Sequence, residues 1–137
     1  MRPPEEARRE LVVRWLAKAE DDWRLCHRLV ADPSYAEATA FHSQQAAEKY
    51  LKAFLTWHQV EFPKTHDIRR LLNLAGVQDP SLAEELSDAA DLTAYAVEYR
   101  YPGEYAPVTT DDAAEAVTIA DRVREQVRRR LPMGGPA

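Results

Sequence analysis

The 137-residue chain has few glycines and a single cysteine, and both shortages exclude classes of protein. Two of its four glycines lie in the last four residues, so neither common type of Gly-rich phosphate-binding loop is present. A nucleotide, if one is bound, must be held by side chains and helix ends. Cys26 is the only cysteine, which excludes an intrachain disulfide and is typical of a reducing cytoplasm.

Long apolar runs and signal segments are also missing. No apolar stretch approaches the ~20 residues that a membrane-spanning helix needs. The stretch 5–10 is rich in charge and has no apolar signal core. We therefore expect a cytoplasmic protein with no membrane span.

Basic residues are outnumbered by acidic ones. The formal net charge is −5 and the sequence pI is about 5.4, whereas general nucleic-acid binders usually have a basic balance. Five arginines nevertheless crowd the C-terminal stretch: Arg122, Arg124, Arg128, Arg129 and Arg130. We interpret them as a solvated helix end, where cations suit the helix dipole; a contact with an anion or with RNA is the alternative.

Apolar residues recur at helical spacing through most of the sequence, and no segment shows convincing strand alternation. The connections are short apart from 102–107, so neighbouring helices should be antiparallel. We predict an all-α fold, an up-and-down antiparallel helical bundle of about five helices in one domain over 1–137, with a frayed tail at 132–137. The predicted helices cover about 5–31, about 35–60, Thr65 or His66 to Gly76, from after Pro80-Ser81 to about Arg100, and from a cap at Thr109 or Thr110 to Leu131.

Local chemistry predicts several helix ends. Thr65 or Asp67 can accept from the first N–H groups of the third helix. Gly76 suits the position just after the C-terminus of that helix. Thr109 or Thr110, followed by Asp111 and Asp112, should cap the last helix.

The run 41–55 is the most informative part of the sequence. Four of its apolar residues recur at i, i+3, i+4 and i+7 and form one helical stripe: Ala47, Tyr50, Leu51 and Phe54. Gln44 lies on the same stripe, and a buried amide needs hydrogen-bond partners. A neighbouring polar stripe consists of Gln45, Lys49 and Lys52, and helical periodicity does not explain it. This run is therefore where we expect the function.

Four segments together carry a family resemblance. They are Ala-Glu-Asp-Asp-Trp at 19–23, Gln-Gln-Ala-Ala-Glu-Lys-Tyr-Leu-Lys-Ala at 44–53, Pro-Lys-Thr-His-Asp at 63–67 and Tyr-Arg-Tyr-Pro at 99–102. In this order and at these spacings they resemble the HEPN domain (higher-eukaryote and prokaryote nucleotide-binding). The resemblance runs from about Trp15 to Leu131.

The resemblance implies a small all-α bundle, a homodimer and a cytoplasmic role. Many prokaryotic members of the family are encoded beside a minimal nucleotidyltransferase and work with it as a toxin–antitoxin pair. Some members are metal-independent RNases, and others are credited with nucleotide binding. No cofactor is implied. We expect no metal site either, since His42 and Glu48 are six residues apart and do not share a helical face.

The catalytic motif of the RNase branch resembles Arg, four to six residues, then His, near the end of a late helix. There the His serves in acid–base chemistry and the Arg steadies the phosphate. No histidine of this chain follows an arginine at that spacing, and the corresponding place has Arg100 without a His, followed by Pro102. We therefore predict a non-catalytic HEPN-like binding module, with an RNase toxin as the alternative.

A nucleotide site is predicted at the start of the third helix. Lys64 and His66 stand where free N–H groups and the helix dipole favour an anion. Arg100 ends a helix that can run antiparallel beside it. A phosphate-bearing ligand suits three cations and an amide, and the candidate residues are Gln44, Lys49, Lys64, His66, Arg100 and, close by, Asp22.

A purely structural interpretation of these residues is kept beside the nucleotide site. In it, His66 caps its own helix or packs against Trp57, Glu48 pairs with Lys52 at i, i+4, and Lys49 is solvated. Asp22 is then either a surface acid or the partner of Gln44 or a lysine.

Tyrosines cluster near the end of the predicted fourth helix. Large aromatic side chains at a helix end need something to cover them, and tyrosine is enriched in interface cores. We predict a dimer interface there, and stacking on a base is the alternative. The residues are Tyr95, Tyr99 and Tyr101.

Overall fold

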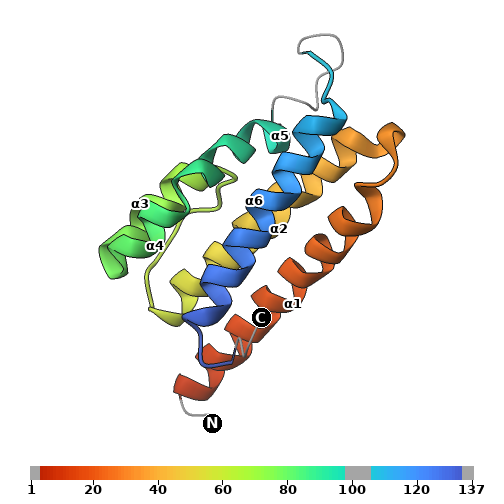
Figure 1. The fold of residues 1–137 in the computed structure, drawn as a ribbon. Coiled ribbons are helices and arrows are strands. Elements are labelled where there is room, and N and C mark those ends of the chain that lie inside the picture. Colours follow the sequence, from red (N-terminus) through yellow and green to blue (C-terminus); the bar gives the residue numbers. More distant parts are fainter. Residues whose placement is uncertain (1–3, 98–105, 134–137) are drawn as a thin grey trace.

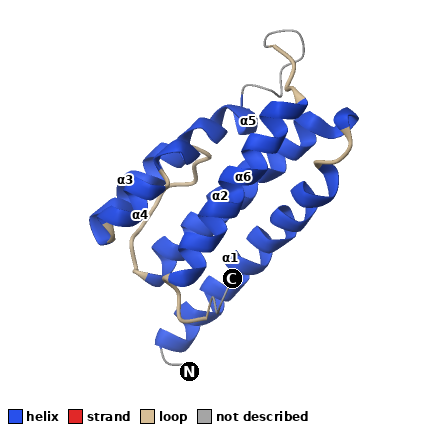
Figure 2. Cartoon of the chain, viewed as in Figure 1, coloured by secondary structure: helices blue, strands red, loops and turns tan. Residues whose placement is uncertain are grey.

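A computed structural model of the chain describes residues 4–97 and 106–133. Nearly all of this part is helical and none of it is a strand, which confirms the predicted all-α bundle (Figure 2). Its α-helices are α1 (Pro4–Leu29), α2 (Ala36–Trp57), α3 (Ile68–Gln78), α4 (Pro80–Glu85), α5 (Thr93–Val97) and α6 (Thr110–Arg129). Two short 3₁₀ helices join them, η1 (Pro33–Tyr35) and η2 (Ser87–Leu92).

Helix α2 is the centre of the bundle and packs against α1, α3, α5 and α6. Figure 1 shows α1 along one side of α2 and α6, and α3 to α5 along the other side. The connection 58–67 runs back along α2, so α3 starts beside the middle of α2 and runs in the same direction as α2 (Figure 1). This return segment places His66 next to the polar side of α2.

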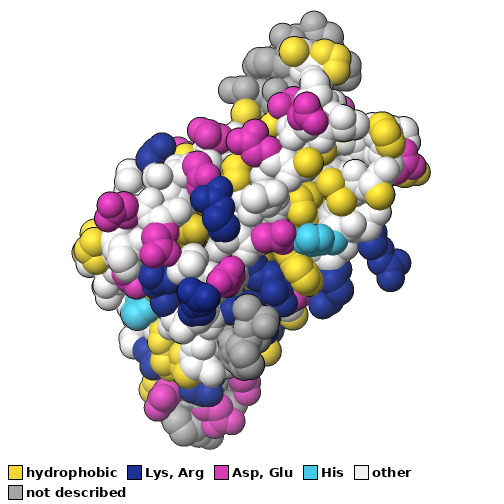
Figure 3. All heavy atoms as spheres, in the orientation of Figure 1, with side chains coloured by type: hydrophobic (Ala, Val, Ile, Leu, Met, Phe, Trp, Pro, Cys, Tyr) yellow, Lys and Arg dark blue, Asp and Glu magenta, His cyan; other side chains and the backbone are white. Residues whose placement is uncertain are grey.

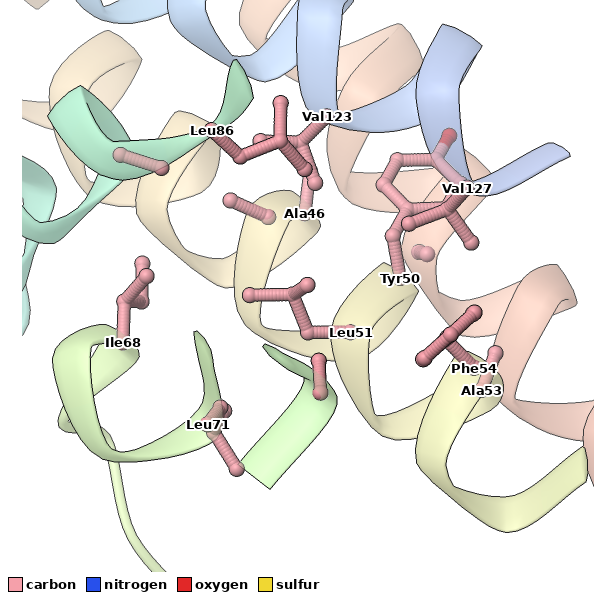
Figure 4. Close-up of a cluster of buried hydrophobic side chains, with 14 of the residues drawn as sticks. Ala46, Tyr50, Leu51, Ala53, Phe54, Ile68, Leu71, Leu86, Val123 and Val127 are labelled. Carbon is pink, nitrogen blue, oxygen red and sulfur yellow. The ribbon is translucent and has the colours of Figure 1, made fainter. Parts of the chain in front are cut away.

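The core surrounds α2, between it and α1, α3 and α6. Figure 4 shows Val127 of α6 beside Tyr50 of α2 and Val123 of α6 beside Leu86, with Leu51 turned toward the side of α3. The apolar stripe predicted for 41–55 is buried, since its four members are at most 1 % exposed. Burial of this stripe, at about 25 cal/mol per Å² of apolar surface, fixes which side of α2 faces inward.

The prediction of one continuous fourth α-helix is wrong. The structure divides 80–97 into α4, η2 and α5. The buried residues Leu86, Ala89 and Leu92 are three apart, which is the repeat of a 3₁₀ helix and not of an α-helix. The α-helical periodicity read for this segment was therefore locally mistaken.

Two of the predicted caps are confirmed and one helix end is wrong. Asp67 accepts from Arg70 N at 3.4 Å, and Thr109 forms a reciprocal capping box with Asp112. Gly76 does not follow α3 but lies inside it, and the helix ends at Gln78. A Cβ at position 76 would lie 3.0 Å from Ala83 Cβ, so this glycine allows α3 and α4 to approach closely.

Candidate functional site

Gln44 is fully buried on α2, and its amide is satisfied by neighbouring groups. Its Nε2 donates to Glu48 Oε1 and to the backbone oxygen of His66, both at 3.1 Å. Its Oε1 accepts from Gln45 Nε2 at 2.6 Å. The buried amide thus ties α2 to the segment that leads into α3.

Glu48 is the hub of this arrangement. Its side chain is 4 % exposed and accepts from Lys52 Nζ at 2.9 Å, in addition to the bond from Gln44. The i, i+4 pairing with Lys52 follows the structural interpretation, but the pair is nearly buried and not a solvated surface pair. A carboxylate removed from water needs several donors, and Glu48 has them.

His66 completes the group, which we call the Glu48 cluster (Gln44, Glu48, Lys52 and His66). Its Nδ1 lies 2.7 Å from Glu48 Oε1, while its side chain is 53 % exposed. A neutral imidazole that donates from Nδ1 keeps an acceptor at Nε2. The cluster therefore has a buried acid at its base and an imidazole at the surface.

The two structural roles considered for His66 are both wrong. Asp67, not His66, is the N-cap of α3. Trp57 lies under the guanidinium of Arg8, whose Cζ is 4.2 Å from the ring centroid, whereas His66 lies at Glu48, more than two helical turns before Trp57 on α2. Hydrogen bonding to Glu48 determines the position of the imidazole instead.

Lys49 and Asp22 belong to a second group, the Asp22 cluster (Asp22, His42 and Lys49). Lys49 Nζ lies 2.5 Å from Asp22 Oδ2, and His42 Nδ1 lies 2.9 Å from Asp22 Oδ1. Burial raises the pKa of Asp22, but hydrogen bonds from His42 and Lys49 and their charges outweigh it, so the pKa is lowered. Asp22 does receive a lysine, as one interpretation allowed, and a solvated Lys49 is wrong.

The structure thus places the predicted site residues in separate settings. Gln44 and His66 lie together in the Glu48 cluster, while Asp22 and Lys49 pair with each other. Lys64 is exposed, two residues before His66. Arg100 lies outside the described residues.

The tyrosine group is described only in part. Tyr95 is half-buried and packs against the core. It also lines a hollow of about 450 Å³ together with Tyr35, Phe41 and His42. Tyr99 and Tyr101 lie outside the described residues.

A third ionic group, the Glu20 cluster (Glu20, Tyr50, Arg124 and Arg128), was missed in the sequence. Glu20 accepts from Tyr50 Oη and Arg124 Nε, each at 3.0 Å, and from Arg128 Nη1 at 2.8 Å. Burial raises the pKa of Glu20, but hydrogen bonds from Arg124 and Tyr50 and the two guanidinium charges outweigh it, so the pKa is lowered. A hydroxyl on the apolar stripe of α2 was the available signal, because Tyr50 needed a partner when buried.

The C-terminal arginines are not a solvated helix end. Besides Arg124 and Arg128, Arg130 binds Asp79 at 2.6 Å, Arg129 binds Glu125 at 2.7 Å, and Arg122 pairs with Asp88. On the face that carries α6, basic and acidic side chains lie interspersed and do not form a single basic patch (Figure 3). Most of these arginines connect α6 to other helices.

Two further observations concern the described residues only. They contain no group of three or more His, Cys, Asp or Glu side chains arranged to hold a metal ion. None of their helices is long and apolar enough to cross a membrane. Cys26 is buried, and burial raises the pKa of its thiol to about 11.

The fold and its polar groups define a small all-α bundle whose central helix carries buried ionised side chains. The family model of the HEPN domain matches residues 12–130. The chain therefore belongs to the HEPN domain family, as its sequence motifs indicated.

Solved structures agree with this membership. An archaeal HEPN homologue, ST0689, is 26 % identical with a TM-score of 0.68, and the match covers 87 % of this chain and 96 % of that chain. TT1696 from Thermus thermophilus is 25 % identical with a TM-score of 0.67, and the match covers 88 % of this chain and 98 % of that chain. None of the curated proteins compared with the chain matches it.

Proposed function

We propose that this chain is a non-catalytic HEPN binding module that forms a homodimer in the cytoplasm and acts with a minimal nucleotidyltransferase partner. The observation that carries the proposal is the missing Arg–His spacing, because the RNase branch needs both side chains for acid–base chemistry on RNA. Three of the four histidines bind a carboxylate: His27 with Asp121 at 2.6 Å, His42 with Asp22, and His66 with Glu48. A carboxylate partner holds an imidazole in one orientation, which suits a binding site.

The module is also proposed to bind a nucleotide, and Lys64 and His66 are the residues best placed to meet its phosphates. The charges of Lys49 and Lys52 are already compensated by Asp22 and Glu48. Arg100 remains a proposed phosphate contact only because the sequence places it at the end of a helix predicted beside the third one.

The start of α3 contributes less to this site than the sequence suggested. Ile68 N donates to Thr93 Oγ1 at 3.0 Å, and Arg70 N donates to Asp67. Two of the first three N–H groups of α3 therefore already have partners, so side chains and not the helix end should hold the ligand.

The test combines RNA with the protein partner. The purified chain is incubated with total RNA without metal, and it is separately co-expressed with the minimal nucleotidyltransferase of its native host and analysed by size exclusion with light scattering. We expect intact RNA and a stable complex of both proteins. Metal-independent cleavage that survives purification and disappears in Arg100→Ala would contradict the proposal.

One observation favours the RNase toxin as the second candidate. Arg8 Cζ lies 4.2 Å from the ring centroid of Trp57, the residue before His58, so an arginine and a histidine distant in sequence lie in one region. Burial lowers the pKa of His58, the charge of Asp79 raises it, and the charge of Arg8 lowers it further. If RNA is cleaved, loss of activity in both His58→Ala and Arg8→Ala, with activity kept in His66→Ala, would support this candidate.

A further inference from the structure

One flank of α1 is only partly covered by the rest of the bundle. Helix α1 lies at the edge of the molecule, and among the described elements it packs mainly against α2 and, less, against α6 (Figure 1). Six residues on this flank follow one another at alternating spacings of four and three, the repeat of a coiled-coil seam. We call this set the α1 seam: Leu11, Trp15, Lys18, Asp22, Leu25 and Leu29.

The α1 seam has more exposed apolar surface than a solvated helix side needs. Leu11 is 47 % exposed and Leu25 is 37 % exposed. Trp15 and Leu29 are half-buried, and Lys18 is exposed. Large apolar side chains repeated along one line of a surface helix are typical of an interface.

Starting from either end, the α1 seam has two apolar residues followed by a charged one. Leu11 and Leu29, Trp15 and Leu25, and Lys18 and Asp22 lie at equal distances on either side of position 20. In a two-fold antiparallel pair of helices, residues at equal distances from the axis face each other. Two α1 helices in this register therefore place apolar residues opposite apolar ones, and each Lys18 opposite an Asp22.

A hollow beside the seam fits the same register. Leu11, Arg14, Trp15 and Lys18 line a space of about 210 Å³. These positions are i, i+3, i+4 and i+7, the four residues that form the hole in knobs-into-holes packing. The middle of the hole lies between positions 14 and 15 along the helix axis. In the antiparallel pair, Leu25 of the second copy lies opposite this point.

The wall of this hollow is held in place by the bundle. The Trp15 ring packs edge-on against Phe62 with centroids 6.3 Å apart, and Lys52 Nζ lies 5.5 Å from the Trp15 centroid. The hole therefore exists before any partner arrives, and little ordering is needed on association.

We propose that two copies of this chain associate through an antiparallel, two-fold pairing of their α1 helices, with Leu25 of each copy in the hollow of the other. This inference rests on the homodimer of the proposed function and names its surface. The apolar pairs and the hollow set the register, because a shift of one copy moves Leu25 out of the hollow of the other. Asp22 adds little to it, since its carboxylate already binds Lys49 and His42 of its own chain.

Cysteine cross-linking tests the register directly. In it, Leu11 of one copy faces Leu29 of the other, whereas Leu11 and Leu29 of one chain, and the two copies of Leu11, are about 27 Å apart along the helix axis. A disulfide needs Cα atoms within about 7 Å. We expect Leu11→Cys/Leu29→Cys to form covalent dimers on mild oxidation, seen on a non-reducing gel, and Leu11→Cys alone to stay uncross-linked. Equal cross-linking of the single and double variants would overturn the register.

A charge placed on the seam tests the surface independently. Leu25→Lys should weaken the dimer about tenfold or more in sedimentation equilibrium, since it removes the knob and adds a charge. Val13→Lys is the matched control, because Val13 is 50 % exposed on another side of α1, and it should leave the dimer unchanged. Circular dichroism confirms that both variants are folded.

The outcomes separate this inference from the proposed homodimer. A wild-type monomer at high micromolar concentration would overturn both. A wild-type dimer that persists in Leu25→Lys but is lost in Tyr95→Ala would overturn the α1 pairing and leave the homodimer standing.

Discussion

Two buried glutamates, Glu20 and Glu48, show how the same side chain serves two purposes in this bundle. Glu20 is 14 % exposed and faces two guanidinium groups and a tyrosine hydroxyl that join α1, α2 and α6. Glu48 is 4 % exposed and faces one ammonium group, one amide and one imidazole. The donors of Glu20 are all partly or fully buried, whereas one donor of Glu48, His66, is half in solvent.

The difference separates a structural ion cluster from a candidate binding site. Around Glu20, the hydrogen-bond donors belong to the packed helices, and its exposed ion-pair partner, Arg24, also binds Asp21 on the same helix. Around Glu48, the buried acid orients an imidazole and leaves its outer edge accessible. Each prediction below changes one side of this comparison and leaves the other intact.

The largest effect is expected for Glu20→Gln. Removing this charge leaves Arg124 and Arg128, each about one fifth exposed, without their carboxylate. Breaking a buried ion pair from one side typically costs about 3–5 kcal/mol. Urea unfolding should therefore show a loss of about 3 kcal/mol or more, whereas the exposed control Glu115→Gln should stay within about 0.5 kcal/mol. Equal stabilities of these two variants would contradict a structural role for the Glu20 cluster.

A smaller loss of stability is expected for Glu48→Gln. Only one buried cation, Lys52, loses its carboxylate, whereas Glu20→Gln leaves two, and the exposed His66 can turn to water. The expected loss is therefore about 3 kcal/mol, the lower end of the usual cost. Glu125→Gln is the matched control, because Glu125 forms an exposed i, i+4 pair with Arg129 that should contribute at most about 0.5 kcal/mol. The prediction fails if Glu48→Gln loses more stability than Glu20→Gln.

Lowering the pH should gradually reduce the contribution of Glu20 to the free energy of unfolding. Its pKa is lowered in the folded chain, so the unfolded chain binds the proton more readily. The stabilisation is complete above the unfolded pKa, about 4.3, and is lost as the pH falls through the folded pKa. The difference in free energy of unfolding between wild type and Glu20→Gln should therefore shrink below about pH 4. A difference that stays constant down to the acid limit of folding would contradict the lowered pKa.

Sequence periodicity predicted the bundle because long amphipathic stretches leave few alternatives. The stripe on 41–55 and the capping box at Thr109 are local patterns, and both appear as predicted. The 3₁₀ segment was missed because Leu86, Ala89 and Leu92 also fit a loose α-helical reading. Gly76 was misplaced because its close approach to Ala83 depends on how α3 and α4 pack.

The candidate site was predictable only where one side chain broke its own pattern. Gln44 on an apolar stripe indicated a polar partner, and the structure supplies Glu48 and the backbone of His66. The partners of Glu20 could not be predicted in the same way, because Arg124 lies 104 residues away and the contact depends on the packing of α6. Tertiary pairs of this kind leave no local signal.

The smallest effect on stability, with the clearest effect on binding, is expected for Lys64→Ala. Lys64 is exposed, so its removal should change the free energy of unfolding by no more than about 0.5 kcal/mol. If it contacts a phosphate, nucleotide affinity should fall about tenfold in calorimetry. Arg28→Ala, at an exposed position near the end of α1, controls for loss of one positive charge. Equal affinities of the two variants would remove Lys64 from the site.

The most direct test of the central claim, that Glu48 presents His66 to a ligand, is long-range ¹H–¹⁵N NMR of the histidine rings during titration with ATP and, separately, inorganic phosphate. His27 and His42 also bind carboxylates and serve as internal controls. The account predicts that the Nε2 signal of His66 shifts with ATP while the signals of His27 and His42 stay in place, and that Lys64→Ala weakens the shift. An unchanged His66 at millimolar ATP, or equal shifts in all three rings, would contradict it.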